Sequence, residues 1–210
     1  VNKGLDRNSP YELRTRYGLT NPGLIKIISY METLTDVNSH DRTTITAALL
    51  FIQGALLRPS ECLAPTSIHQ QDPHDPTHTS MTRQDIRMMS APDGKTTAID
   101  IYVRKSKTNN HGVHLTPLMA VDNKQICPVS NLKAYLRLPS RDINGPLFVL
   151  QDGSFLTLGT LDTWIKRLTF ECGMGDMGYS TYSLRSGGTM ALATAGCVSD
   201  YIKKVGRWRS

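Results

Sequence analysis

Apolar and polar residues alternate over residues 98–104, in the middle of a chain whose other apolar residues follow helical spacing. Alternation is the pattern of a strand with one buried face. The segment Pro92-Asp93-Gly94 before this run and the segment Asn109-Asn110-His111-Gly112 after it are turn sequences. Extended segments at 84–89 and 113–118 lie beyond these turns. The pattern therefore predicts a small three-stranded antiparallel sheet of hairpins.

The rest of the chain has helical periodicity. Asn21 and Pro22 supply a cap and a first-turn proline for the first helix, and Gly196 ends a later one. The expected helices cover residues 21–31, 41–57, 128–138, 160–172, 184–195 and 199–205. We expect an α+β fold, mainly helical, in which residues 1–20 form a linker or arm and residues 21–210 form one domain.

Charge and cysteine usage limit the classes of protein to consider. The chain has 210 residues, with 24 Lys and Arg against 18 Asp and Glu, and a net charge of +6. A mildly basic surface suits a polyanion, because bound Lys and Arg release the counterions condensed on phosphates. No apolar run reaches the length of a membrane span, and the start of the chain is not a signal peptide. The four scattered cysteines are typical of a reducing compartment.

The first candidate functional segment is Leu57-Arg58-Pro59-Ser60-Glu61, at the end of the predicted helix 41–57. A carboxylate three residues after an arginine can brace the guanidinium, and a braced guanidinium can grip a phosphate through two N–H groups. For this segment alone, the alternative is a surface ion pair at a helix junction.

The second candidate segment is Arg104-Lys105-Ser106-Lys107-Thr108, at the end of the predicted strand 98–104. Lys107 can reach from this position into a cleft and act as a general acid, if neighbouring cations favour the loss of its proton. The alternative is an edge strand that lysines protect against aggregation.

The third candidate segment is Tyr182-Ser183-Leu184-Arg185-Ser186-Gly187-Gly188-Thr189, followed by Gly206-Arg207-Trp208-Arg209-Ser210. Arg185 is expected to open a helix, where free N–H groups and the helix dipole also favour a phosphate. Two glycines lower the stability of a helix, which indicates that Gly187 and Gly188 allow close packing there. The alternative is a core helix with a capping arginine.

Taken in this order, the segments resemble the tyrosine recombinase or phage integrase family. The resemblance rests on Arg-x-x-Glu after an Ala- and Leu-rich helix, Ser-Lys-Thr at a hairpin, Leu-Arg-Ser-Gly-Gly-Thr, and Gly-Arg-Trp-x-Ser. It covers residues 21–210. The phrasing of Leu57–Glu61 and of Ser106–Thr108 is similar to recombinases of eukaryotic mobile elements, of the crypton and DIRS-retrotransposon kind. The resemblance implies the catalytic domain of this family, with its DNA breaking-rejoining fold.

The resemblance also implies a function, which is site-specific DNA recombination or integration. In this family a tyrosine attacks a DNA phosphodiester, and a second strand reverses the resulting 3′-phosphotyrosine. No metal or other cofactor is expected, because the covalent intermediate keeps the bond energy. By position, the resemblance makes the following residues catalytic: Arg58, Lys107, Tyr182, Arg185 and Trp208. It makes Glu61 the support of the first arginine.

Specific roles follow from the same resemblance. Arg58 and Arg185 would hold the non-bridging oxygens of the scissile phosphate and stabilise the charge of the transition state. Lys107 would protonate the leaving 5′-oxygen, and Trp208 would buttress the phosphate and the nucleophile.

Two features depart from the family pattern. Tyr182 stands where the family usually has histidine, and a phenol is a poor proton acceptor at neutral pH. The nucleophilic tyrosine is expected about nine residues past Trp208, beyond Ser210, so the chain is expected to be a fragment that does not cleave DNA by itself. One alternative is therefore a catalytically inactive, DNA-binding relic of a recombinase. A second is an enzyme like type IB topoisomerases, which share the chemistry.

The loop around residues 67–80 raises one further possibility. His69, His74 and His78, with Cys62, could form a zinc site. Their spacing on a proline-interrupted loop is poor for a compact site, so we expect a flexible insertion and no metal.

The expected partners also follow from the resemblance. They are double-stranded DNA and other copies of the chain assembled on paired DNA sites, with no membrane and no small-molecule substrate. The expected location is the nucleus if the source is a eukaryotic element, which the Arg-Pro-Ser-Glu phrasing favours, and the cytoplasm otherwise.

Overall fold

The computed structural model of the chain describes residues 17–65, 80–104, 111–139 and 144–208. Its helices are α1 (Asn21–Thr33), α2 (Ser39–Gly54), α3 (Pro59–Cys62), α4 (Pro128–Leu136), α5 (Leu158–Glu171), α6 (Thr181–Thr194) and α7 (Ser199–Gly206). Two 3-10 turns are η2 (Arg83–Asp85) and η3 (Lys124–Ile126), and the strands are β1 (Ile86–Ser90), β2 (Thr96–Val103), β3 (Val113–His114) and β4 (Leu118–Met119). The prediction of a mainly helical α+β fold is confirmed.

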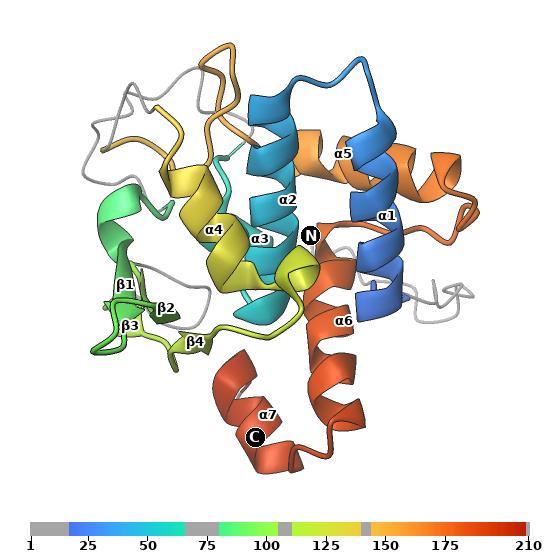
Figure 1. The fold of residues 1–210 in the computed structure, drawn as a ribbon. Coiled ribbons are helices and arrows are strands. Elements are labelled where there is room, and N and C mark those ends of the chain that lie inside the picture. Colours follow the sequence, from blue (N-terminus) through green and yellow to red (C-terminus); the bar gives the residue numbers. More distant parts are fainter. Residues whose placement is uncertain (1–16, 66–79, 105–110, 140–143, 209–210) are drawn as a thin grey trace, which may run out of the picture.

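Helix α2 runs through the centre of the molecule, with α4 and the sheet on one side and α1 on the other (Figure 1). The Asn38 side chain caps its start by accepting a hydrogen bond from the backbone N–H of Asp41 at 2.8 Å. Residues on nearly all sides of its second half are buried, as expected for a helix that is apolar all round. The helix ends before its predicted end at Leu57, because Leu56 turns into the left-handed region with φ of 46°.

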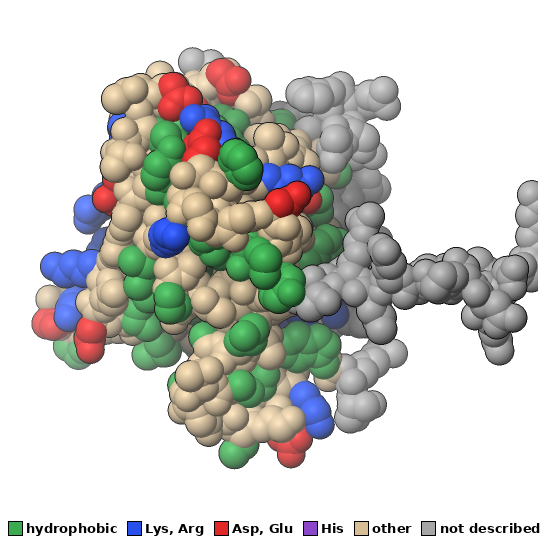
Figure 2. Space-filling model, turned by 90° about the vertical axis from the view of Figure 1, so that its right-hand side faces the viewer, with side chains coloured by type: hydrophobic (Ala, Val, Ile, Leu, Met, Phe, Trp, Pro, Cys, Tyr) green, Lys and Arg blue, Asp and Glu red, His purple; other side chains and the backbone are tan. Residues whose placement is uncertain are grey.

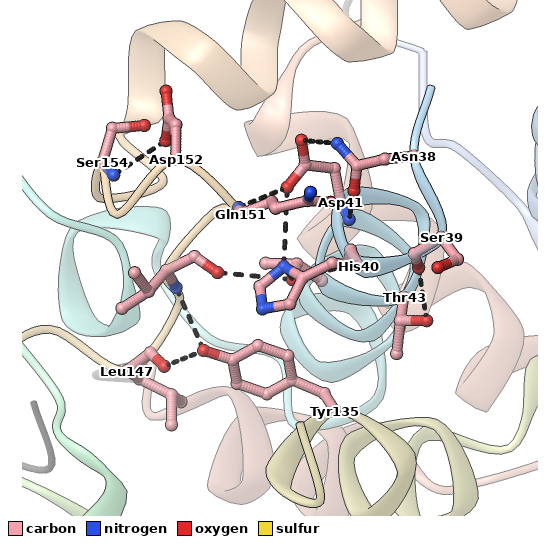
Figure 3. Close-up of polar contacts among 12 residues, drawn as sticks. Asn38, Ser39, His40, Asp41, Thr43, Tyr135, Leu147, Gln151, Asp152 and Ser154 are labelled. Atoms are coloured by element: carbon pink, nitrogen blue, oxygen red, sulfur yellow. Dashed lines mark hydrogen bonds and ion pairs between the residues drawn. The ribbon is translucent and has the colours of Figure 1, made fainter. Parts of the chain in front are cut away.

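A network of hydrogen bonds attaches residues 147–151 to the N-terminal end of α2 and to α4 (Figure 3). Asp41 accepts from the backbone N–H of Gln151 at 2.7 Å. The Tyr135 hydroxyl donates to the carbonyl of Leu147 at 2.6 Å and accepts from the N–H of Val149 at 3.0 Å. Because buried backbone groups need partners, these contacts hold residues 147–151 in place.

Among the described residues, the antiparallel sheet has four strands where the sequence predicted three. The segment expected as one strand over 113–118 is split into β3 and β4, and both pair with β2. Leu118 pairs near the start of β2 and Val113 at its end. Pro117 stands between the two strands and has no N–H to donate to a ladder, which explains the interruption.

The open end of the β1–β2 hairpin is held by a buried carboxylate. Asp85 accepts from Nε of Arg104 at 2.8 and 3.0 Å, and from the backbone N–H of Thr82 at 2.8 Å. The Thr82 hydroxyl, which donates to Asp85, also accepts from Arg104. This cluster holds Arg104, the residue that follows β2, against η2 at the start of the hairpin.

Replacing Asp85 with alanine is expected to lower the free energy of unfolding by about 2–3 kcal/mol, because charge-assisted hydrogen bonds are lost and the donors of Thr82 remain buried. Urea unfolding would measure this change. The matched control is Asp100→Ala on β2, whose partner His114 is exposed, and it is expected to change stability little. Equal losses from the two substitutions would contradict the proposed role of Asp85.

Helix α6 approaches the first described residues of the chain very closely. Leu19, which the predicted arm included, is fully buried, and its N–H donates to the carbonyl of Ser183 at 2.8 Å. A Cβ on Gly187 would lie 1.9 Å from the Leu19 carbonyl oxygen. The close packing expected from the two glycines is thus present, and a second chain segment lies directly against the helix.

The end of α6 and helix α7 form a projection at the C-terminal end of the described chain (Figures 1 and 2). An apolar groove of about 400 Å³ separates this projection from α2 and the β3–β4 segment, and its lining includes Leu50, Leu118, Ala191, Tyr201 and Val205. Within the described residues, the structure contains no helix with the length and apolar character needed to cross a membrane.

Candidate active site

Arg58 and Glu61 meet across the first turn of α3. The backbone N–H of Arg58 donates to Glu61 Oε2 at 2.7 Å, and its Nη1 donates to Oε1 at 3.0 Å. The Glu61 side chain is 1% exposed, whereas that of Arg58 is 20% exposed. The ion pair expected from the sequence is therefore present, with the guanidinium partly exposed and its brace buried.

Arg185 lies between the C-terminal ends of two helices. Its Nη1 donates to the carbonyl of Leu56, just past α2, at 2.6 Å, and its Nη2 donates to the carbonyl of Gly206, the last residue of α7. Helix C-termini carry partial negative charge, so both ends stabilise a cation. The expectation that Arg185 opens a helix is wrong: α6 begins a turn earlier at Thr181, whose N–H donates to the carboxylate of Asp162 at 2.6 Å.

The ring of Trp208 covers the Arg185 guanidinium, with 4.7 Å between the guanidinium carbon and the ring centroid. A cation over an indole face contributes about 0.5–2 kcal/mol, depending on how far it is desolvated. The contact requires glycine at position 206, because a Cβ there would lie 1.8 Å from an indole carbon. The fold thus brings together the predicted residues Arg185 and Trp208 with the end of α2.

Arg207 completes a cluster with Arg58, Glu61 and Arg185, although the sequence did not single it out as a site residue. Its Nη2 donates to Glu61 Oε2 at 2.6 Å, so one buried carboxylate serves two arginines. Arg207 has φ of 56°, in the left-handed region. Its place between Gly206 and Trp208 was the only sequence signal, and that signal says nothing of a contact with Glu61.

The charges of this cluster are not balanced. Burial, followed by the positive charges of Arg207 and Arg58, lowers the pKa of Arg185 to about 10, while Glu61 acts in the opposite direction. Burial also lowers the pKa of Arg207, and again Glu61 opposes the effect. A guanidinium is always charged in proteins at neutral pH. Three positive charges around one carboxylate form a site that an anion would stabilise.

The two other predicted catalytic residues are placed differently. Tyr182 lies in the first turn of α6, one turn before Arg185, and is 49% exposed. Residues three apart in a helix share a face, so the phenol and the guanidinium lie along the same side of α6. Lys107 lies in the segment 105–110, outside the described residues. The role of Lys107 as a general acid therefore stays a prediction.

The residues of the possible zinc site are only in part described. His69, His74 and His78 fall within residues 66–79, outside the described part of the chain. The Cys62 side chain is buried in α3, and burial, with the nearby Glu61 charge, raises the pKa of its thiol well above the usual value. A buried neutral thiol behaves as a small apolar group in the core.

Comparison of sequences identifies no relative, because no protein-family model and no curated protein matches this chain. Comparison of structures does find similar folds. The chain is similar to the XerH site-specific recombinase bound to its difH substrate in a pre-cleavage complex, with a TM-score of 0.64 and 18% identity over 93% of this chain. It spans 48% of the length of that recombinase.

Two other recombinase structures share the fold. The Tn1549 transposon integrase in complex with circular intermediate DNA gives a TM-score of 0.53 with 14% identity, over 98% of this chain and 60% of the integrase. The FLP recombinase in a Holliday junction complex gives a TM-score of 0.56 with 16% identity, over 89% of this chain and 42% of that protein. The described chain therefore has a tyrosine recombinase-like fold.

Proposed function

We propose that this chain is the catalytic domain of a site-specific DNA recombinase or integrase. The observation that carries the proposal is that Arg58, paired with the buried Glu61, lies close enough to Arg185 for its charge to lower the pKa of Arg185, in a chain with this fold. Two convergent guanidinium groups suit the non-bridging oxygens of a phosphodiester, because each can donate two parallel hydrogen bonds.

The proposed reaction is a reversible exchange at phosphorus. A tyrosine hydroxyl gives its proton to solvent water as it attacks the scissile phosphate, the phosphorus–5′-oxygen bond breaks, and the leaving oxygen takes a proton from Lys107. Arg58 and Arg185 stabilise the charge on the equatorial oxygens of the transition state, and Trp208 packs beside them. A 5′-hydroxyl of a second strand then attacks the phosphotyrosine, which restores the tyrosine. Since the covalent bond stores the energy of the broken one, the reaction needs no nucleotide or metal.

The proposed partners are double-stranded DNA and further copies of the protein on paired sites. The net charge of +6 and the uncompensated arginine cluster suit the DNA backbone. The nucleus is the proposed location for an origin in a eukaryotic mobile element of the crypton or DIRS kind.

A second candidate function is DNA binding without cleavage. Tyr182 favours it, because a half-exposed phenol is a poor proton acceptor where the related enzymes usually carry histidine. Both functions require binding to duplex DNA, and only the first requires a covalent adduct. A topoisomerase-like activity would instead relax a supercoiled plasmid that carries a single binding site.

The test starts from a duplex selected out of a randomised pool by binding to the chain of 210 residues. That duplex, nicked near its centre to trap the intermediate, is incubated with a chain extended to the proposed tyrosine, about nine residues past Trp208. We expect a covalent protein–DNA adduct that withstands detergent, and none when that tyrosine is replaced by phenylalanine.

The possible results separate the candidate functions. An extended chain that binds the duplex without forming an adduct, or a reading frame with no tyrosine at that place, contradicts recombination and supports the DNA-binding relic. If the chain selects no duplex from the pool, that result contradicts both recombination and DNA binding without cleavage.

A further inference from the structure

Two backbone conformations in the structure require an explanation. Among the described residues, Leu56 and Arg207 are the only ones other than glycine with positive φ. Leu56 follows the end of α2, and Arg207 follows the end of α7. In each case the N–H of the next residue donates a hydrogen bond to a carbonyl in the last turn of the helix. This helix-ending motif usually has glycine at the left-handed position, because a Cβ is unfavourable there.

The two left-handed residues lie together, although they are far apart in the sequence. Arg207 Nη2 lies 3.5 Å from the Leu56 carbonyl oxygen and 2.6 Å from Glu61 Oε2. The Leu56 carbonyl also accepts a hydrogen bond from Arg185. Unfavourable backbone conformations persist where the surroundings impose them, and they cluster at functional sites.

The side chain at position 207 is also unfavourable to bury. Its Nε and Nη1 are buried and have no hydrogen-bond partner among the described residues. A glycine would avoid both the backbone cost and the unpaired donors. The benefit of arginine must therefore lie in what its guanidinium holds in place.

We infer that Arg207 is a positioning residue, which sets the orientation of Arg185 and Trp208 by attaching the end of α7 to Glu61. The inference rests on the proposed function. Both neighbours of Arg207 in the sequence contact Arg185, Gly206 through its carbonyl and Trp208 through its ring. The ion pair with Glu61 holds this short segment against α3, so the two contacts form together with it.

The first measurement uses the fluorescence of Trp208 without DNA. The chain has two tryptophans, so Trp164→Phe makes Trp208 the only indole, and excitation at the long-wavelength edge of absorption avoids the tyrosines. In this background we expect Arg207→Gly to shift the emission to longer wavelength and to increase quenching by acrylamide, because the ring leaves Arg185. The emission and quenching of Arg207→Lys should lie between those of the parent and of Arg207→Gly, since an ammonium keeps the charge and loses the paired N–H groups of the guanidinium.

Two controls calibrate this readout. Gly206→Ala leaves Arg207 in place and pushes the ring away from its position, so it should show the full fluorescence change. Lys204→Ala removes a positive charge from an exposed position on α7 and should leave Trp208 unchanged. Unchanged emission and quenching in Arg207→Gly would overturn the inference.

The second measurement is the affinity for the selected duplex as a function of salt. Arg207→Gly should weaken binding about tenfold or more, the effect of losing a charged hydrogen bond that orients the site. The slope of log affinity against log salt should stay unchanged, because a positioning residue does not touch the phosphate. A slope reduced by about 0.9 would indicate a lost phosphate contact and overturn the positioning role. If the parent chain binds no duplex, the proposed function fails and the fluorescence still decides the role of Arg207.

Discussion

Replacing Arg185 with lysine is expected to slow formation of the covalent adduct by at least about 100-fold, the usual effect of removing one group that stabilises transition-state charge. The measurement is single-turnover trapping on the nicked duplex by the extended chain. The guanidinium donates to the Leu56 and Gly206 carbonyls and still has N–H groups left for a phosphate oxygen. An ammonium keeps the charge but cannot serve these three acceptors in one plane.

Lysine is the informative substitution because it keeps the cation between the two helix ends. Arg185→Ala should lose the adduct as well, but it also leaves two helix ends without their cation, so a loss of fold could explain its result. The matched control is Arg167→Ala, which removes an arginine that pairs with Asp36 and Glu171 at the surface of α5. A lysine variant with the parental rate would contradict the role proposed for Arg185.

Replacing Gly188 with alanine is expected to destabilise the chain by about 3 kcal/mol or more, because overpacking against a rigid neighbour is unfavourable. A Cβ at this position would lie 2.3 Å from the carbonyl oxygen of Gln53 and 2.5 Å from Cδ2 of Leu56. Helix α6 would have to move away from the end of α2. That movement would also separate Arg185 from the Leu56 carbonyl, so duplex binding should fall together with stability.

The sign of this effect is the test, because alanine normally stabilises a helix relative to glycine by up to about 1 kcal/mol. Gly159, in the first turn of α5, provides the control. A Cβ there would meet its nearest neighbour at 3.9 Å, so Gly159→Ala should be neutral or stabilising. Thermal or urea unfolding of the two variants would compare them, and a Gly188→Ala variant as stable as the parent would contradict the close packing of α6 on α2.

The predicted elements agree with the structure where local pattern decides them. The apolar alternation over 98–104 corresponds to β2, and the helical spacing predicts the positions of α1, α2, α4, α5 and α6. The errors lie at element ends and at the third strand. The start of α6 depends on Asp162 in another helix, and Pro117 divides the third strand into two. A periodicity argument averages over several residues and does not detect such single contacts.

Parts of the candidate site could be predicted from the sequence to different degrees. The Arg58–Glu61 pair spans three residues, so its spacing alone indicated the contact. Arg185 was singled out for an expected place at a helix start, which the structure contradicts, and Trp208 was selected by resemblance to a family. The role of Arg207 could not be predicted, because its contact with Glu61 joins residues that are 146 positions apart.

By itself, the sequence determined the helices, the hairpins and the local ion pair, because these depend on interactions within a few residues. The tertiary structure alone decided that the C-terminal ends of α2 and α7 meet around Arg185. It also decided that Leu56 and Arg207 adopt left-handed conformations there. The physical reason is that packing of α6 against α2, through Gly188, sets the distance between segments that the chain itself leaves independent.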